Sequence, residues 1–144
     1  MDEYYEDVTV GETRSFGSYE VTREEIVDFA EKYDPQPFHT DPDAARNSMF
    51  GSLVASGWHT ASISMRLLVD NYLNESGAMG SPGLESLRWL RPVRPGDVLS
   101  IEVRTTDKEP WDGDRGVVES HLETVRDDGE TVMTWDSLVL FPRA

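Results

Sequence analysis

The chain has 144 residues, no internal repeat and no low-complexity linker, so residues 1–144 are predicted to form one domain. It contains no cysteine, which excludes disulfides, a thiolate nucleophile and thiolate metal ligands. Its 28 acidic and 13 basic residues give a formal net charge of -15, which disfavours nucleic acid as a partner because phosphate binding needs clustered cations.

The first half of the chain begins with a predicted strand over residues 13–21. Thr22, followed three residues later by Glu25, has the form of a capping box at the start of a helix. Apolar residues then fall at helical spacing as far as Tyr33, and the proline that follows Asp34 disfavours helical geometry there. The helix is therefore predicted to end near Tyr33, with Asp34 just beyond it.

Prolines and turn formers dominate residues 34–51, with a short helical piece expected over residues 41–47. Residues 52–73 carry the longest helical pattern in the chain, in which apolar residues are mixed with small ones. Small side chains allow other elements to approach closely. We expect this helix to be central and buried.

The second half changes to the alternating pattern of β-strands. Strands are expected over residues 84–93, 99–103, 116–125 and 131–141. The step from Asp128 to Gly129 is a strong hairpin signal between the last two. Helices followed by an antiparallel meander predict an α+β domain, with one long helix laid across a curled antiparallel sheet.

Asp34 and His39 are the strongest candidates for catalytic groups. They lie five residues apart on a segment that two prolines stiffen, shortly before the predicted central helix. An imidazole is well matched to proton transfer near neutral pH, and a carboxyl group beside it in a dry pocket can carry a second proton. Taken singly, each has a structural explanation, a turn cap for Asp34 and a hydrogen-bonded loop histidine for His39. Their combination favours an acid–base pair.

Residues 34–39, Asp-Pro-Gln-Pro-Phe-His, resemble the Asp-x-Asn-Pro-x-His core of the MaoC-like (R)-specific enoyl-CoA hydratases. Residues 50–57 resemble that family's entry to its central helix, and residues 90–97 resemble the strand and turn that follow the helix. The resemblance covers nearly the whole chain. It implies a hot-dog fold and an enzyme that adds water reversibly to a trans-2-enoyl-CoA thioester to give a (R)-3-hydroxyacyl-CoA.

The resemblance also implies the roles of three residues. Asp34 and His39 would be the acid and base around one water molecule, and the backbone N–H of Gly57 would bind the thioester oxygen. The latter role agrees with physics, because N–H groups in the first turn of a helix lack an internal partner and lie at the positive end of its dipole. Close packing of the helix against the sheet is a second, compatible reason for a glycine. No cofactor is expected beyond the coenzyme A of the substrate.

Three positions depart from the family pattern. Gln36 replaces the asparagine of the motif, and Ser56 replaces the histidine before the helix-start glycine. Met65 stands between Ser64 and Arg66, where the better-known hydratases have a serine. The first two departures remove no proton carrier, whereas the third weakens inference of the substrate from those enzymes.

Further side chains are predicted to bind the substrate. Arg88, Arg91 and Arg94 form the densest basic stretch and suit the phosphates of coenzyme A, although strand alternation splits them between two faces and surface arginines are the default. The other predicted substrate-binding residues are Gln36, Phe38, Ser56 and Trp58. The remaining histidines, His59 and His121, are interpreted as structural. With three histidines at unrelated spacings and no cysteine, no metal site is expected.

Two alternative functions remain open at this point. One is an acyl-CoA thioesterase on the same scaffold, in which a carboxylate directs water at the thioester carbonyl. The other is a non-catalytic subunit that binds acyl thioesters. Release of free thiol distinguishes the first from hydration, and tight binding without turnover distinguishes the second.

The expected partners are the acyl-CoA substrate and further copies of the chain. A single unit of this fold exposes a sheet edge, so a homodimer or higher homo-oligomer is predicted. No apolar run approaches the roughly 20 residues that span a bilayer, and the acidic N-terminal segment is unlike a secretory signal. We expect a cytoplasmic protein, and the dispersed acidic residues indicate a salt-rich cytoplasm.

Overall fold

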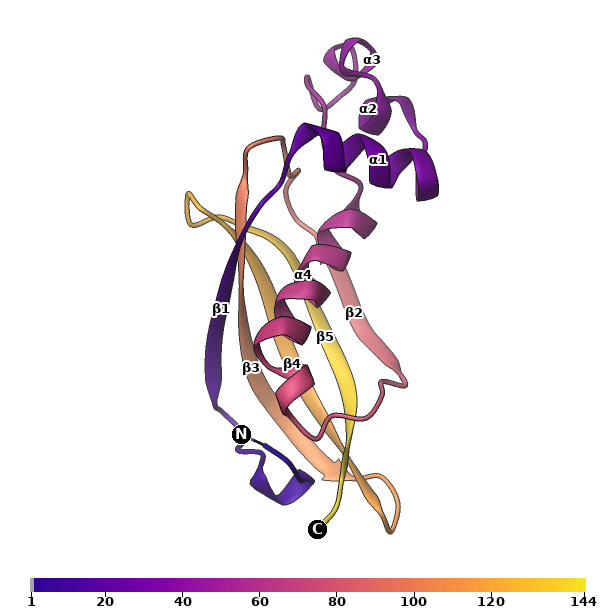
Figure 1. Ribbon diagram of the computed structural model, residues 1–144. Coiled ribbons are helices and arrows are strands. Elements are labelled where there is room, and N and C mark those ends of the chain that lie inside the picture. Colours follow the sequence, from indigo (N-terminus) through magenta and orange to yellow (C-terminus); the bar gives the residue numbers. More distant parts are fainter. Residues whose placement is uncertain (1) are drawn as a thin grey trace.

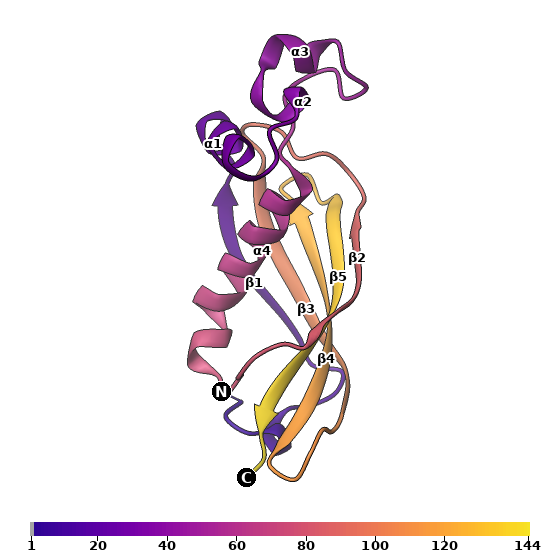
Figure 2. The same ribbon diagram turned by 90° about the vertical axis from the view of Figure 1, so that its right-hand side faces the viewer.

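The computed structural model describes residues 2–144, in which five strands form one antiparallel sheet in the order β1-β3-β4-β5-β2. The strands are β1 (Thr13–Glu20), β2 (Gly83–Trp89), β3 (Val98–Pro110), β4 (Arg115–Arg126) and β5 (Thr131–Pro142). The sheet curls around one long helix, α4 (Gly57–Asn71), which runs along one of its faces (Figure 1, Figure 2). This arrangement confirms the predicted α+β fold with a long helix on a curled antiparallel sheet.

The smaller helices lie at the two ends of the sheet. They are η1 (Tyr5–Asp7), α1 (Arg23–Tyr33), α2 (Pro37–Thr40), α3 (Pro42–Arg46) and η2 (Leu73–Glu75). Helices α1, α2 and α3 gather beside the start of α4, whereas the two chain ends lie at the opposite end of the molecule (Figure 1). None of the helices formed by residues 2–144 is long and apolar enough to cross a membrane.

Helix α1 begins and ends where the sequence predicts. The Thr22 hydroxyl accepts a hydrogen bond from the backbone N–H of Glu25 at 3.2 Å, and the helix stops at Tyr33. The Glu25 side chain, however, accepts hydrogen bonds from the Tyr19 hydroxyl and lies 3.0 Å from Nε2 of His59. Only the Thr22 half of the predicted capping box therefore forms, because the Glu25 carboxylate is used at the junction of β1, α1 and α4.

Helix α4 starts five residues later than predicted, at Gly57 rather than residue 52. The backbone N–H groups of Val54 and Ala55 donate to the carbonyls of Phe38 and Val93, at 3.3 and 2.8 Å, which keeps this stretch extended. The small and apolar side chains there are compatible with a helix as well as with an extended segment. The conformation therefore depends on these hydrogen bonds to carbonyls distant in the chain. Strand β2 is likewise shorter than predicted and ends at Trp89.

The core lies between α4 and the sheet. Ile63 and Leu67 of the helix pack against fully buried residues of the strands, including Leu99, Leu122 and Met133. The opposite face of the helix is open, and Met65 on it is 43% exposed. The prediction of a buried central helix is thus correct for one face only, because the sheet covers one side.

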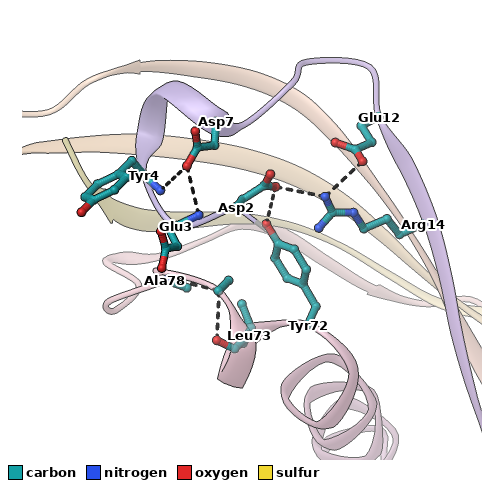
Figure 3. Close-up of polar contacts among 10 residues, drawn as sticks. Asp2, Glu3, Tyr4, Asp7, Glu12, Arg14, Tyr72, Leu73 and Ala78 are labelled. Carbon is teal, nitrogen blue, oxygen red and sulfur yellow. Dashed lines mark hydrogen bonds and ion pairs between the residues drawn. The ribbon is translucent and has the colours of Figure 1, made fainter. Parts of the chain in front are cut away.

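A polar network fastens the N-terminal segment to the far end of α4 (Figure 3). The Asp2 carboxylate accepts hydrogen bonds from the Tyr72 hydroxyl at 2.9 Å and from the Arg14 guanidinium at 3.1 Å. The Arg14 guanidinium also lies 4.4 Å from the centre of the Tyr72 ring. Burial and the neighbouring Asp2 carboxylate raise the pKa of Tyr72, so its hydroxyl remains a hydrogen-bond donor.

Gly17 marks a point where helix and sheet meet too closely for a side chain. It has φ +82° within the irregular part of β1, and a Cβ added there would lie 2.5 Å from Cδ2 of Leu67.

We expect Gly17→Ala to lower the free energy of unfolding by about 2–4 kcal/mol, because backbone strain and overpacking add. Denaturant unfolding measures the change. Gly129→Ala is the matched control, since φ is +88° and an added Cβ meets nothing within 4 Å. Equal losses in the two variants would contradict the packing argument.

Candidate active site

Asp34 and His39 meet at the end of the sheet that α1 and α2 cover. Asp34 is the residue that ends α1, and His39 lies within α2. Oδ2 of Asp34 lies 3.4 Å from Nε2 of His39, and their side chains are 19% and 8% exposed. The predicted pair is therefore formed, in a partly dry environment.

The backbone determines which nitrogen of His39 carries hydrogen. Nδ1 lies 2.7 Å from the carbonyl oxygen of Val54. A carbonyl oxygen only accepts hydrogen bonds, so Nδ1 must donate. In the neutral ring Nε2 then presents a lone pair toward Asp34. At 3.4 Å the two groups make at most a long contact, and both can accept hydrogen bonds from one water molecule.

Two further side chains hold the Asp34 carboxylate. The Gln36 amide donates to Oδ1 at 2.7 Å, and the Ser56 hydroxyl donates to Oδ2 at 2.7 Å. Burial acts to raise the pKa of Asp34, but the hydrogen bonds from Gln36 and Ser56, with the nearby His39, lower it below its ordinary value. Asp34 is thus held as a carboxylate at neutral pH.

These contacts explain two of the departures from the family motif. Gln36 reaches back from two residues further along the chain to bind Asp34, and Ser56 binds the same carboxylate from the start of α4. The Ser56 hydroxyl oxygen also accepts the backbone N–H of Trp58 at 3.3 Å, which caps the helix. Both replacements therefore brace Asp34. The third departure, Met65, lies on the exposed face of α4.

Gly57 is the first residue of α4 and lies beside this pair. The Ser56 hydroxyl accepts the N–H of Trp58 at 3.3 Å, and the Ser56 carbonyl accepts the N–H of His59 at 3.0 Å. Among residues 2–144 no acceptor is found for the N–H of Gly57. A free N–H at the positive end of a helix can bind an oxygen that gains negative charge.

A cleft of about 420 Å³ connects His39 with Gly57. Its walls are mainly apolar and aromatic, and they include Phe38, Phe50 and Trp89. This volume and lining are typical of a site for a small organic ligand. The cleft thus places an apolar ligand next to a proton carrier and a free backbone N–H.

Two of the predicted substrate-binding residues, Phe38 and Arg91, line the cleft. The Arg91 guanidinium also donates to the Thr131 carbonyl at 3.0 Å and pairs with Glu130 at 3.2 Å. Gln36 and Ser56 lie at the site but contact Asp34. Arg91 is therefore the one predicted arginine that reaches the cleft.

The other predicted contacts lie outside the cleft. Arg94 donates to the Ser52 hydroxyl and, at 2.9 Å, to the Phe50 carbonyl, so it braces the segment before α4. Arg88 is exposed on β2, and Trp58 is exposed on α4. Strand alternation, together with the early end of β2, separates the three arginines.

The remaining histidines each pair with a carboxylate away from the cleft. Nε2 of His59 lies 3.0 Å from Glu25, while its buried Nδ1 has no partner among the described residues. Nδ1 of His121 lies 2.7 Å from Asp136 on the adjacent strand. Across residues 2–144 no group of three potential metal ligands is found.

Two parts of the site were missed by sequence reasoning. The Val54 carbonyl, which orients His39, belongs to a backbone that only tertiary contacts keep extended. Trp89 packs against Gly57 across 32 residues of chain and donates a hydrogen bond to its carbonyl. The position of a backbone carbonyl cannot be predicted from residue type, because every residue has one. For Trp89 the only indication in the sequence is an aromatic residue near the end of a predicted strand.

Comparison with known proteins places this geometry in a family. Residues 7–126 match the family described as MaoC like domain. The MaoC-like dehydratase from Rhodospirillum rubrum is 39% identical, with a TM-score of 0.90 over 98% of this chain and 97% of that one. A monoamine oxidase regulatory protein from an archaeon of the genus Archaeoglobus is 28% identical, with a TM-score of 0.93 over 99% and 96% of the two chains.

A third similar structure is the (R)-hydratase from A. caviae involved in PHA biosynthesis. It is 25% identical, with a TM-score of 0.74 over 92% of this chain and 96% of that one. The chain belongs to the MaoC-like domain family and has its hot-dog fold. That family includes hydratases and dehydratases, which supports lyase chemistry in broad terms.

The hydrogen bond from Ser56 makes a measurable contribution to the charge state of Asp34. We expect Ser56→Ala to raise the pKa of Asp34 toward its ordinary value, because one of two donors to the carboxylate is removed. The titration of the Asp34 carboxyl carbon, followed by NMR on the folded protein, measures the shift. Ser62→Ala is the control, since Ser62 donates to the Trp58 carbonyl elsewhere on α4. An unchanged Asp34 titration in Ser56→Ala would refute the argument.

Proposed function

We propose that the protein is a hydratase that adds water reversibly to a trans-2-enoyl-CoA thioester and forms a (R)-3-hydroxyacyl-CoA. The single observation that carries this proposal is that Asp34 Oδ2 and His39 Nε2, which can both accept a hydrogen bond, lie 3.4 Å apart. They lie beside a cleft that reaches Gly57. Such a pair suits one bound water molecule. The stereochemistry follows the (R)-hydratase to which the chain is similar.

In the proposed reaction, water donates one hydrogen bond to the Asp34 carboxylate and one to Nε2 of His39. As the water oxygen bonds to C3 of the enoyl group, one proton passes to Nε2. The electron pair of the double bond moves toward the thioester oxygen, where the N–H of Gly57 stabilises the charge. The imidazolium then returns the proton to C2. One water molecule supplies both the hydroxyl group and the added hydrogen, and the enzyme is restored.

The lining of the cleft suits both parts of an acyl-CoA, the apolar acyl chain and the charged coenzyme A. Its aromatic walls suit an acyl chain, and Arg91 is a cation on its lining that suits a phosphate of coenzyme A. Because Arg91 also pairs with Glu130, binding of a phosphate there would compete with that ion pair. No cofactor beyond coenzyme A is proposed.

The experiment that tests this function follows the ultraviolet absorbance of conjugated enoyl thioesters, with crotonyl-CoA and longer or branched enoyl-CoAs in high-salt buffer. A parallel assay measures free thiol. Loss of absorbance without thiol supports the hydratase. Thiol release would favour a thioesterase, and binding without either signal would favour a non-catalytic acyl-thioester-binding subunit.

The acid–base pair makes a sharper prediction. Asp34→Asn and His39→Ala should each lower turnover by about 10²- to 10⁴-fold while the fold persists. His39→Ala removes the group that carries the proton, and Asp34→Asn removes the carboxylate that accepts a hydrogen bond from the reacting water. Steady-state hydration kinetics and circular dichroism measure the two properties. His121→Ala is the control, since it removes a histidine–carboxylate pair outside the cleft and should retain wild-type turnover. Near-normal activity of either folded site variant would exclude the proposed mechanism.

We also propose that the protein acts as a homodimer that pairs through β2. This strand is at one edge of the sheet, and among the described strands it pairs only with β5. Exposed apolar side chains accompany that edge, including Leu84 at 46% and Trp58 at 57%. A free strand with apolar flanks favours pairing with a second copy.

The dimer proposal predicts that a charge on this edge separates the subunits. Wild-type protein should sediment with twice the mass of one chain, and Leu84→Lys should shift it toward the monomer because the lysine opposes edge pairing. Val10→Lys changes an apolar residue that is 50% exposed near the opposite edge and should leave the mass unchanged. A monomeric wild type, or equal behaviour of the two variants, would rule out pairing through β2.

A further inference from the structure

Trp89 meets the start of α4 at the residue that the proposed reaction uses. Its indole Nε1–H donates to the carbonyl of Gly57 at 2.8 Å. Its ring also fills the space beside the Gly57 Cα, since a Cβ added at that position would lie 2.4 Å from Cε2 of the indole. Residue 57 must therefore be a glycine for Trp89 to lie where it does.

The hydrogen bond from Trp89 is not needed to satisfy the Gly57 carbonyl. This carbonyl belongs to the first turn of α4, where helix geometry directs the N–H of the residue four positions later toward it. A carbonyl oxygen has two lone pairs, so the indole is an additional donor. The extra bond orients the peptide group between Gly57 and Trp58, in the first turn of the helix.

Orientation matters here because glycine has the least restricted backbone of all residues. Gly57 is held from two sides, by Trp89 and by Ser56, whose hydroxyl accepts the next N–H of the helix. Ser56 also binds Asp34. Both contacts hold the peptide group between Gly57 and Trp58, and the Trp89 ring packs beside the Gly57 Cα. Together they hold the helix turn from which the free Gly57 N–H, on the preceding peptide group, projects.

Trp89 contributes little to the core. It is 44% exposed at the end of edge strand β2, and its main aromatic neighbour is Trp58, edge-on with ring centres 5.1 Å apart. Trp58 is itself 57% exposed. Its indole lies against the cleft and the first turn of α4 instead of in the core.

We propose that Trp89 is a positioning residue that holds the Gly57 N–H toward the thioester oxygen. This inference rests on the proposed function, because it assumes that a thioester carbonyl occupies the cleft. Loss of the indole N–H should weaken polarisation of that carbonyl and slow hydration. It should leave the affinity of the apolar acyl group nearly unchanged, since the aromatic wall persists.

The test compares Trp89→Phe with wild type in two measurements. Difference infrared spectroscopy of bound butyryl-CoA with an isotope-labelled carbonyl should show a lowered stretching frequency in wild type and a smaller lowering in Trp89→Phe. The kcat for crotonyl-CoA hydration should fall about 3- to 10-fold, the size expected for one neutral hydrogen bond, with KM changed by less than about twofold. Trp111→Phe is the matched control, since Trp111 is 51% exposed and lies between β3 and β4. The connection of these two strands is at the end of the sheet away from α1 (Figure 1).

A second variant separates the hydrogen bond from packing. A tryptophan analogue in which sulfur replaces the indole N–H, incorporated at position 89, keeps the ring shape and should give the same two changes. Wild-type carbonyl frequency and kcat in both folded variants would overturn the positioning role and leave the hydratase proposal standing. A carbonyl shift that depends on Trp89, without hydration by wild type, would overturn the hydratase and retain the positioning role. A wild type that binds butyryl-CoA without any carbonyl shift would overturn the positioning role.

Discussion

The hydrogen bond from the Ser56 hydroxyl to the Asp34 carboxylate joins the end of α1 to the start of α4. Two parts of the site meet at this junction, because the carboxylate follows the last residue of α1 and the free N–H of Gly57 begins α4. The same hydroxyl accepts the N–H of Trp58 and so caps the helix. One small side chain thereby links the Asp34 carboxylate to the first turn of α4, where the free N–H of Gly57 lies.

Two of the departures from the family pattern contribute contacts to the site. Gln36 and Ser56 both differ from the family pattern, yet both donate to Asp34 and, with the nearby His39, outweigh the effect of burial on its pKa. A carboxylate is thus retained in a partly dry pocket. His39 is oriented in a different way, by the backbone carbonyl of Val54, which leaves its other nitrogen facing Asp34.

The fold explains why the site lies at one end of the molecule. The sheet covers only one face of α4, and the helices α1, α2 and α3 gather beside its first turn (Figure 1, Figure 2). Asp2, Arg14 and Tyr72 secure the opposite end of the helix (Figure 3). With its far end fastened, α4 presents a fixed N-terminus to the cleft, and the exposed edge strand β2 contributes the Trp89 wall.

Local patterns in the sequence determined the order of the long elements, the end of α1 at Tyr33, the α+β class and the closeness of Asp34 and His39 along the chain, because caps, prolines and periodicity act over a few residues. The short helix α2, which carries His39, was not predicted. Only the tertiary structure decided that α4 begins at Gly57, that Glu25 turns toward His59, that Arg88 lies outside the cleft and that Trp89 lies against Gly57. Each of these depends on contacts between residues far apart in the chain. Such contacts decide between conformations that local propensity leaves nearly equal in free energy.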